Sequence, residues 1–313
     1  MKTLKNTILG LVLSLGSLTI YAQQSPIYTH YMNNTLMVNP AYAGSRDALS
    51  VTALYRSQWV GYSGAPTTQT LTMHSPLRNE HIGLGLSVMN DKIGPCNNTS
   101  VFFDYAFIMR LTEKSKLALG LSAGINIYQA NLSSLLLDQQ NDPVFEDDIE
   151  NKVTPNFGLG VYYSRERFYA GISSPYILQN SYSVKNLDNE TALIAKEQRH
   201  YFIIAGAQLN LTDKIALRPT SLIKITRSAP IEADFTASFI IMKRVQIGAM
   251  YRTGDAFGCL VGVNITNKLH LGYSFDWSYG LKTSEYNQGS HELVLRYDFV
   301  FYDKDQVHSP RNF

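Results

Sequence analysis

Alternation of apolar with small or polar side chains, with a period of two residues, runs along almost the whole chain and constrains its fold more than any other feature. Between residues 116 and 127, for example, Leu117, Leu119 and Leu121 alternate with Ala118 and Gly120. Successive side chains of a β-strand point to opposite faces, so each such segment has one apolar face and one small or polar face. Fourteen segments have this pattern and predict an all-β fold: 49–58, 67–74, 81–90, 99–110, 116–127, 154–163, 167–174, 200–209, 214–223, 231–241, 245–252, 257–264, 268–277 and 290–301.

The lengths and connections of these segments predict a transmembrane antiparallel up-and-down β-barrel. A tilted strand needs about 9–11 residues to cross a bilayer, and bacterial single-chain barrels have an even number of strands. Connections after the odd-numbered segments are mostly longer than those after the even-numbered ones, the longest being 128–153 and 175–199. This asymmetry is typical of outer-membrane barrels, which have short periplasmic turns and long external loops. A soluble β-sandwich gives no reason for it.

Composition excludes several other classes of protein. The mean hydropathy of −0.11 is too low for a bundle of membrane helices, but barrel strands are apolar on one face only. The formal charge of +2 gives no basic bias toward nucleic acid. The two cysteines rule out a disulfide scaffold and a four-cysteine zinc site. We expect Cys96 and Cys259 to be free thiols, because their segments lie far apart around a fourteen-strand ring.

The two ends of the chain are predicted to lie outside the barrel strands. Residues 1–22 have the layout of a secretory signal peptide, with Lys2 and Lys5 before an apolar run that ends near Ala22. Residues 23–48 form an N-terminal arm that is a luminal plug, a periplasmic tether or an unstructured arm, and we favour a position in the lumen or at its edge. The barrel is expected over residues 49–302, and residues 303–313 form a C-terminal tail.

Charge decides which face of the strands meets lipid. A charged side chain on the lipid face costs about 2–4 kcal/mol at the middle of the bilayer. Charged residues within the segments share the smaller, more polar face, which is therefore the lumen: Asp104, Arg218, Glu232, Asp234, Arg252, Asp276, Arg296 and Asp298. Glycines on the same face leave room for something to fill the lumen: Gly83, Gly85, Gly120, Gly124, Gly158, Gly160, Gly248 and Gly272.

Aromatic residues near strand ends are typical of the interfacial girdles of membrane barrels, although ordinary core aromatics would give a similar pattern. They are Tyr55, Trp59, Tyr62, Tyr162, Tyr163, Tyr169, Tyr176, Tyr251, Trp277, Tyr279 and Tyr302.

Catalytic and metal-binding patterns are poorly represented, and we predict neither an enzyme nor a cofactor. The sequence has no His-Glu-x-x-His and no phosphate loop. The seven histidines show no ligand spacing. Residues 138–150 are acid-rich, but their spacing does not match an EF-hand, so a solvated external loop is favoured over a calcium site.

Several stretches resemble the PorP/SprF family of membrane proteins. The N-terminal stretch YTHYMNNTLMVNPAYAG (28–44) is similar to the family signature, as are YRSQW (55–59) with TTQTLTMHSP (67–76), and IGLGLSVMNDKIG (82–94). The tail Ser309–Phe313 matches the family's Ser-Pro-Arg-x-Phe ending, except that the family more often has Tyr where this chain has Asn312. The resemblance covers essentially the whole chain after residue 22.

The resemblance implies an outer-membrane barrel of a Bacteroidetes-type bacterium, associated with type IX secretion and gliding motility. It implies that the partners are membrane lipid and a large secreted adhesin with a C-terminal sorting domain, and that some members also associate with periplasmic parts of the machine.

Two functions from different classes follow from the sequence. The first is an interaction protein that holds or receives a secreted adhesin, with loops 128–153 and 175–199 as its docking surface. The second is a pore for small or hydrophobic solutes, which a fillable lumen would allow. The residues that we single out for partner contact or for the lumen are Asn39, Pro40, Tyr42, Gly44, Arg56, Gln58, Trp59, Asp104, Asp276 and Arg296. For the first seven, a structural role in shaping the arm or anchoring the rim is an equal alternative.

Overall fold

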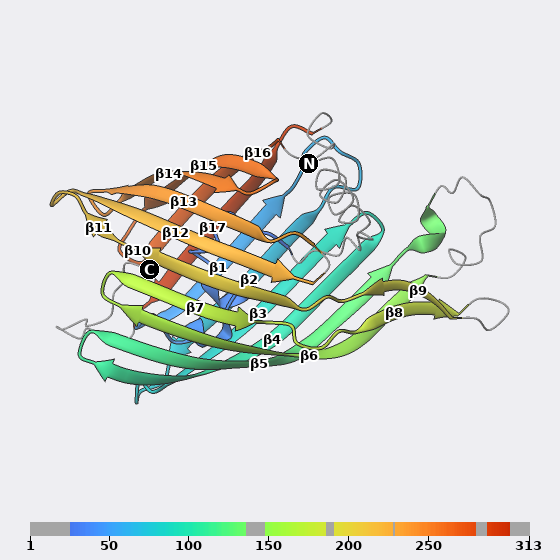
Figure 1. Ribbon diagram of the computed structural model, residues 1–313, viewed down its shortest axis with the longest axis horizontal. Coiled ribbons are helices and arrows are strands. Elements are labelled where there is room, and N and C mark those ends of the chain that lie inside the picture. The colour runs from blue at the N-terminus through green and yellow to red at the C-terminus, as the bar shows by residue number, and fades with distance from the viewer. Residues whose placement is uncertain (1–25, 136–147, 186–190, 228, 280–286, 301–313) are drawn as a thin grey trace, which may run out of the picture.

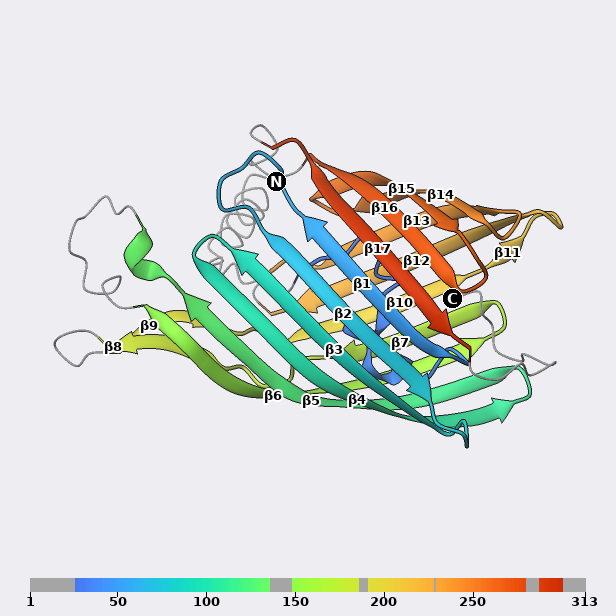
Figure 2. The same cartoon turned by 180° about the vertical axis from the view of Figure 1, so that it is seen from behind.

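The computed structural model describes residues 26–135, 148–185, 191–227, 229–279 and 287–300, and within them it is a closed barrel of fourteen antiparallel strands. Its strands tilt steeply around a single ring (Figures 1 and 2). They are β1 (Leu49–Ser57), β2 (Thr67–Pro76), β3 (Ile82–Ile93), β4 (Cys96–Thr112), β5 (Ser115–Ala130), β6 (Ile149–Arg165), β7 (Phe168–Ser174), β10 (His200–Ala207), β12 (Ile215–Thr226), β13 (Glu232–Ile241), β14 (Val245–Arg252), β15 (Ala256–Asn264), β16 (Leu269–Ser278) and β17 (Ser290–Phe299).

Two seams close the ring. The first strand β1 pairs with the last strand β17, from Leu49 opposite Phe299 to Ser57 opposite His291. Strand β10 pairs with β12, and the two-residue strand β11 (Leu209–Asn210) continues this edge. Every neighbouring pair is antiparallel, so each barrel strand finds partners on both sides. Closure removes the free strand edges that hydrocarbon does not tolerate.

Burial alternates along the strands as the sequence pattern predicts. On β4 the side chain of Phe103 is 68% exposed, whereas its neighbours Phe102 and Asp104 are buried. On β5 Leu119 and Leu121 are likewise exposed. The outward face is therefore an apolar band, which is the surface a bilayer solvates. No helix among the described residues is long and apolar enough to cross a membrane.

The fourteen predicted segments coincide with the fourteen barrel strands to within a few residues at most ends, but the sequence underestimates three of them. Strands β4, β5 and β6 have 17, 16 and 17 residues. Residues 91–98, which the sequence analysis treats as a loop, continue the β3–β4 hairpin to a tight turn at Gly94 and Pro95. Their polar side chains conceal the strand, because this part of the hairpin extends past the apolar band.

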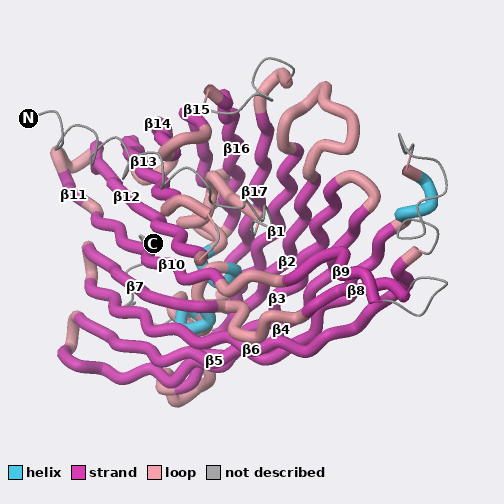
Figure 3. Tube along the Cα trace, turned by 45° about the vertical axis from the view of Figure 1, so that its right-hand side comes forward, coloured by secondary structure: helices cyan, strands magenta, loops and turns pink. Residues whose placement is uncertain are grey.

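An additional two-stranded hairpin, β8 (Ser181–Lys185) with β9 (Thr191–Lys196), was not predicted. It lies in the connection between β7 and β10 and extends the wall at one end of the ring (Figures 1 and 3). We call this end the loop end, because it carries the connections 58–66, 131–148, 175–199 and 279–289. The opposite end is the turn end, with the connections 77–81, 113–114, 166–167, 242–244 and 265–268.

The core of the molecule lies inside the ring rather than between sheets. Residues 26–48, here called the luminal segment, lie in the lumen and contribute nine residues to the buried apolar cluster, including Tyr31, Leu36 and Ala41. Two 3₁₀ turns shape this segment, η1 (Thr35–Met37) and η2 (Pro40–Tyr42), and Figure 3 shows them enclosed by the strands. A third, η3 (Leu132–Ser134), follows β5 at the loop end.

The girdle prediction is wrong for three tyrosines. Tyr162 and Tyr169 are 3% and 2% exposed and stack on each other in the lumen, and Tyr176 lines an internal cavity. Tyr162 lies at an inward position of β6, which continues for three residues beyond it. Exposed aromatic side chains do gather at the loop end, where Tyr279 stacks on Tyr251 and Phe257. Tyr302 lies outside the described residues, as do residues 1–25, 136–147 and 303–313.

Candidate functional site

Inward glycines make the space through which the luminal segment passes. A Cβ atom at Gly120 would lie 2.1 Å from the backbone nitrogen of Ala41, and one at Gly83 would lie 2.1 Å from the carbonyl oxygen of Ala43. Such distances are far below van der Waals contact. The wall and the segment therefore touch backbone to backbone, as glycine permits where two chains approach closely.

The stretch from Asn39 to Gly44 turns against this glycine surface. Asn39 is fully buried, and its side-chain oxygen accepts a hydrogen bond from Ala41 N at 2.9 Å, which caps η2. Its amide group donates to Val161 O on β6 at 3.0 Å. Gly44 adopts φ +71°, a conformation that favours glycine, and its N–H donates to His74 Nδ1. These requirements account for the spacing of Asn, Pro and Gly in this stretch.

Hydrogen bonds fix the segment to strands on opposite sides of the ring. The Tyr31 hydroxyl is 3.0 Å from Thr220 Oγ1 on β12. The Asn34 side-chain amide donates to Thr70 Oγ1 at 2.8 Å, and its oxygen accepts a hydrogen bond from Thr72 Oγ1, also on β2, at 2.8 Å. On β7, Ser173 Oγ donates to Val38 O at 2.7 Å. Contacts with so many strands hold the segment in one position within the lumen.

A buried ionic cluster anchors the other end of the segment near the loop end. The backbone N–H groups of Thr29 and His30 donate to the Glu292 carboxylate at 2.9 and 2.6 Å, and Thr29 Oγ1 donates to Asp276 Oδ2 at 2.6 Å. Arg56 Nη1 lies 2.8 Å from Asp276 Oδ2 and 3.1 Å from Glu292 Oε2. Arg56, Asp276 and Glu292 are each 1% exposed. We call these five residues the latch.

Further ion pairs continue from the latch along the lumen wall. Arg252 binds both carboxylate oxygens of Asp234, at 2.7 and 3.1 Å, and lies 3.8 Å from Asp276. Lys224 pairs with Glu232 at 3.5 Å. Both signs of charge occur, and the buried groups are paired, as charges shielded from water require.

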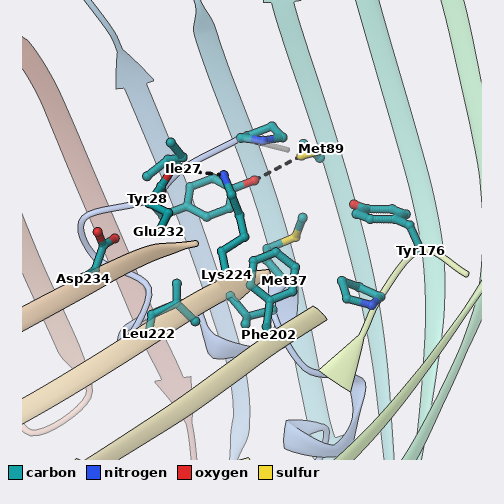
Figure 4. A pocket seen from close by; sticks show the side chains of 13 residues that line it. Ile27, Tyr28, Met37, Met89, Tyr176, Phe202, Leu222, Lys224, Glu232 and Asp234 are labelled. Atoms are coloured by element: carbon teal, nitrogen blue, oxygen red, sulfur yellow. Dashed lines mark hydrogen bonds and ion pairs between the residues drawn. The ribbon is translucent and has the colours of Figure 1, made fainter. Parts of the chain in front are cut away.

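An apolar cavity of about 490 Å³ opens between the luminal segment and the wall beside these pairs. Figure 4 shows Tyr28 and Met37 of the segment facing Phe202 and Leu222 of the wall, with Lys224, Glu232 and Asp234 along one side. Burial raises the pKa of the Tyr28 hydroxyl, which stays protonated and donates to Met89 Sδ at 3.0 Å. The cavity has the mostly apolar lining that is typical of small-molecule sites.

The remaining predicted residues lie apart from the latch. Asp104 lines a second cavity, next to Leu36 and Pro40, and accepts a bond from Ser87 Oγ at 2.8 Å. Tyr42 contacts the rings of His74 and Tyr162 edge to face. Gln58 and Trp59 follow β1 in the loop-end connection, where Gln58 N donates to Pro66 O and Trp59 N donates to Ser290 Oγ. Arg296 lies near the turn end, 3.3 Å from Asn33 Oδ1.

The sequence analysis missed Glu292 and Thr29 as members of the site. Glu292 shares the inward parity of Val294 and Arg296 on β17, so strand alternation alone could have revealed it. Thr29 has no such pattern, and its partners are 247 and 263 positions away in the sequence. Among the described residues no group of three or more histidine, cysteine, aspartate or glutamate side chains could hold a metal ion.

The ring of tilted strands, the outward apolar band and the filled polar lumen define an outer-membrane β-barrel. The fold is similar to that of several solved structures. They include the CymD monoaromatic hydrocarbon channel (TM-score 0.51, 10% identity, 86% of this chain and 93% of that chain) and the Acinetobacter baumannii outer membrane protein Omp33 (TM-score 0.44, 10% identity, 81% and 99%). The NanC porin is a third example (TM-score 0.39, 9% identity, 80% and 99%). At such identities the likeness concerns the fold alone.

The chain belongs to the type IX secretion system membrane proteins of the PorP/SprF family, whose model matches residues 20–297. The family resemblance in the sequence is thereby confirmed over nearly the whole barrel and the luminal segment. No curated protein matches the chain.

Proposed function

We propose that this barrel is an anchoring scaffold that supports the secretion or surface attachment of a large adhesin-type protein with a C-terminal sorting domain. The observation that carries the proposal is the filled lumen. The luminal segment bonds to the walls at both ends of the ring, from Thr29 at the latch to Gly44 beside His74. A barrel filled in this way is suited to present a fixed outer surface rather than to conduct solutes.

The β8–β9 hairpin forms a platform at the loop end, and the contacts that hold it to the barrel wall support the same proposal. The Glu197 carboxylate accepts hydrogen bonds from Asn126 on β5, Asn156 on β6 and Tyr182 on β8, at 2.9, 3.1 and 2.5 Å. The ring of Tyr182 stacks on Tyr128 at 4.3 Å between centroids. These contacts tie the β8–β9 hairpin to the barrel wall, and loops held on a rigid scaffold commonly carry binding.

Affinity purification from detergent-solubilised membranes tests the proposal. We expect a large surface protein with a C-terminal sorting domain to co-elute with the full-length barrel. Replacing residues 181–196 by a short Gly-Ser linker should abolish the co-elution while the barrel still folds, because only the platform is removed. Recovery of the same protein in equal amount with the replaced hairpin would contradict docking at the loop end.

A pore for small or hydrophobic solutes is the second candidate, and the apolar cavity of Figure 4 is the observation that favours it. Movement of the luminal segment would connect this cavity to both ends of the ring. Uptake of a hydrophobic solute by liposomes containing the purified barrel, above the uptake by empty liposomes, would favour this function over anchoring.

A further inference from the structure

The buried carboxylate of Asp104 has no ionic partner among the described residues, unlike the carboxylates of the latch. Asp104 lies on the inward face of β4 and is 5% exposed. Its Oδ2 accepts a hydrogen bond from Ser87 Oγ at 2.8 Å, and within the described parts of the chain the side chain forms no other hydrogen bond and no ion pair. A carboxyl group is ionised at neutral pH in water, and burial of its charge is costly without an opposite charge. Asp104 therefore requires a partner that the residues around it do not supply.

The cavity that Asp104 lines places hydroxyl oxygens around the carboxylate. Ser122 also lines it and lies directly opposite Asp104 in the β4–β5 ladder, where Cβ atoms are about 4.5–5.5 Å apart. The Ser122 hydroxyl makes no hydrogen bond to any described residue. Ser87 and Ser100 complete the set, and their protons are engaged: Ser87 donates to Asp104, and Ser100 donates to Asn126 Oδ1 at 2.8 Å. The oxygen lone pairs of both serines are therefore available to a ligand.

The charge, the donor atoms and the size of this cavity all favour a small monovalent cation. One carboxylate with several hydroxyl oxygens is a hard donor set, of the kind that alkali and alkaline-earth cations prefer. Among the described residues of the lining only Asp104 is charged. A monovalent ion balances this charge, whereas a divalent ion would leave an excess positive charge buried. The space between the side chains admits about one particle of the size of a water molecule.

We propose that Asp104, Ser87, Ser100 and Ser122 bind one alkali cation, of the size of sodium or potassium, between the barrel wall and the luminal segment. The carboxylate supplies the balancing charge, and the hydroxyl oxygens replace part of the ion's hydration shell. The site does not rest on the anchoring function, because it includes none of the platform residues.

Binding of the ion is linked to docking of the luminal segment. Leu36 and Pro40 of the segment line the same cavity, and a Cβ atom at Gly85 would lie 3.1 Å both from Leu36 Cδ2 and from Asp104 Cβ. The docked segment therefore covers the carboxylate and shields it from water. A cation that binds only when the segment is docked stabilises the docked state by mass action.

Hydrogen–deuterium exchange of a peptide covering residues 26–48, measured on the full-length barrel in lipid nanodiscs, tests the site. Chloride salts of sodium, potassium and N-methyl-D-glucamine are compared at equal ionic strength, so that screening is the same. The third cation is too large for the cavity. We expect sodium or potassium to slow exchange by about tenfold relative to it, as a ligand present at about ten times its Kd would. Slow exchange with only one of the two identifies the ion. Equal exchange in all three salts, as expected if Asp104 carries a proton instead, would overturn the proposal.

Matched variants locate the salt effect. Asp104→Asn carries no charge and needs no counter-ion, so exchange should be slow in all three salts. Asp213→Asn makes the same substitution at an exposed position of the connection before β12 and should keep the wild-type difference. A salt effect that persists in Asp104→Asn would show that the ion acts elsewhere and would overturn the proposal.

A second pair of variants covers the case in which Asp104→Asn does not fold. Ser122→Ala removes one ligand and should reduce the salt effect from about tenfold to about threefold or less. Ser274→Ala removes a buried hydroxyl of β16 outside the cavity and should leave the effect unchanged. Equal salt effects in these two variants contradict the assigned site.

Discussion

Replacing Arg56 by methionine should release the luminal segment from its latch. The guanidinium holds two carboxylates that are 1% exposed, and its loss leaves both with reduced compensation. Removing one partner of a buried ion pair typically costs about 3–5 kcal/mol. We expect the lower figure, because Glu292 keeps two backbone donors and Asp276 keeps the Thr29 hydroxyl.

This cost falls on the docked state of the segment. Once the segment leaves the lumen, water reaches the carboxylates and solvates them. A loss of about 3 kcal/mol should therefore raise the population of the undocked state by about 10²-fold. Hydrogen–deuterium exchange of a peptide covering residues 26–48, measured in lipid nanodiscs, reports this population through the protection of its amides. Heat-modifiable migration on gels verifies that the barrel itself stays folded.

Two further variants make the measurement decisive. Arg110→Met is the matched control, because it makes the same substitution at an exposed arginine that pairs with Glu80. An exposed ion pair contributes about 0–1 kcal/mol, so exchange of the luminal segment should hardly change. The double variant Arg56→Met with Glu292→Gln removes both charges and should recover part of the protection, because the amide oxygen still accepts the backbone bonds. The reasoning is refuted if Arg56→Met leaves exchange within about threefold of the wild type, which is less than about 0.7 kcal/mol.

Three other predictions concern the wall. Phe103→Arg places a charge on the lipid face near the middle of β4 and should lower the free energy of unfolding in urea by about 2–4 kcal/mol, whereas Phe103→Leu should cost much less. Gly120→Val introduces a Cβ against Ala41 and should increase exchange of the luminal segment, while Leu121→Val on the outward face should not; equal exchange in the two would contradict the close approach. Cys259 is a free, exposed thiol on the lipid side of β15, so a membrane-soluble maleimide should label it and a membrane-impermeant one should not.

Most of the barrel could be predicted from the sequence because its physics is local. Lipid on one side and a polar lumen on the other impose alternation on every strand, and this periodicity places Asp104, Asp276 and Arg296 on the inward face without knowledge of their partners. The same rule also places Tyr162 on the inward face, but the girdle prediction gave its position near a predicted strand end more weight than parity. Parity was the stronger constraint, because β6 continues to Arg165.

Contacts that depend on register could not be predicted in the same way. The latch joins Thr29 to residues near the other end of the chain, and no local pattern specifies that Arg56, Asp276 and Glu292 meet at one height in the ring. The β8–β9 hairpin was missed for a different reason, because its strands have five and six residues, fewer than the roughly 9–11 that a strand needs to cross a bilayer.

The contact between the luminal segment and β17 ties completion of the chain to closure of the ring. The segment precedes every strand, yet the carboxylate that holds its backbone belongs to the last one. That same strand forms the seam with β1. A nascent chain that ends before β17 cannot close the barrel wall, and it lacks the Glu292 carboxylate that binds the luminal segment. Insertion of the final strand thus completes the cylinder and captures its contents in one event.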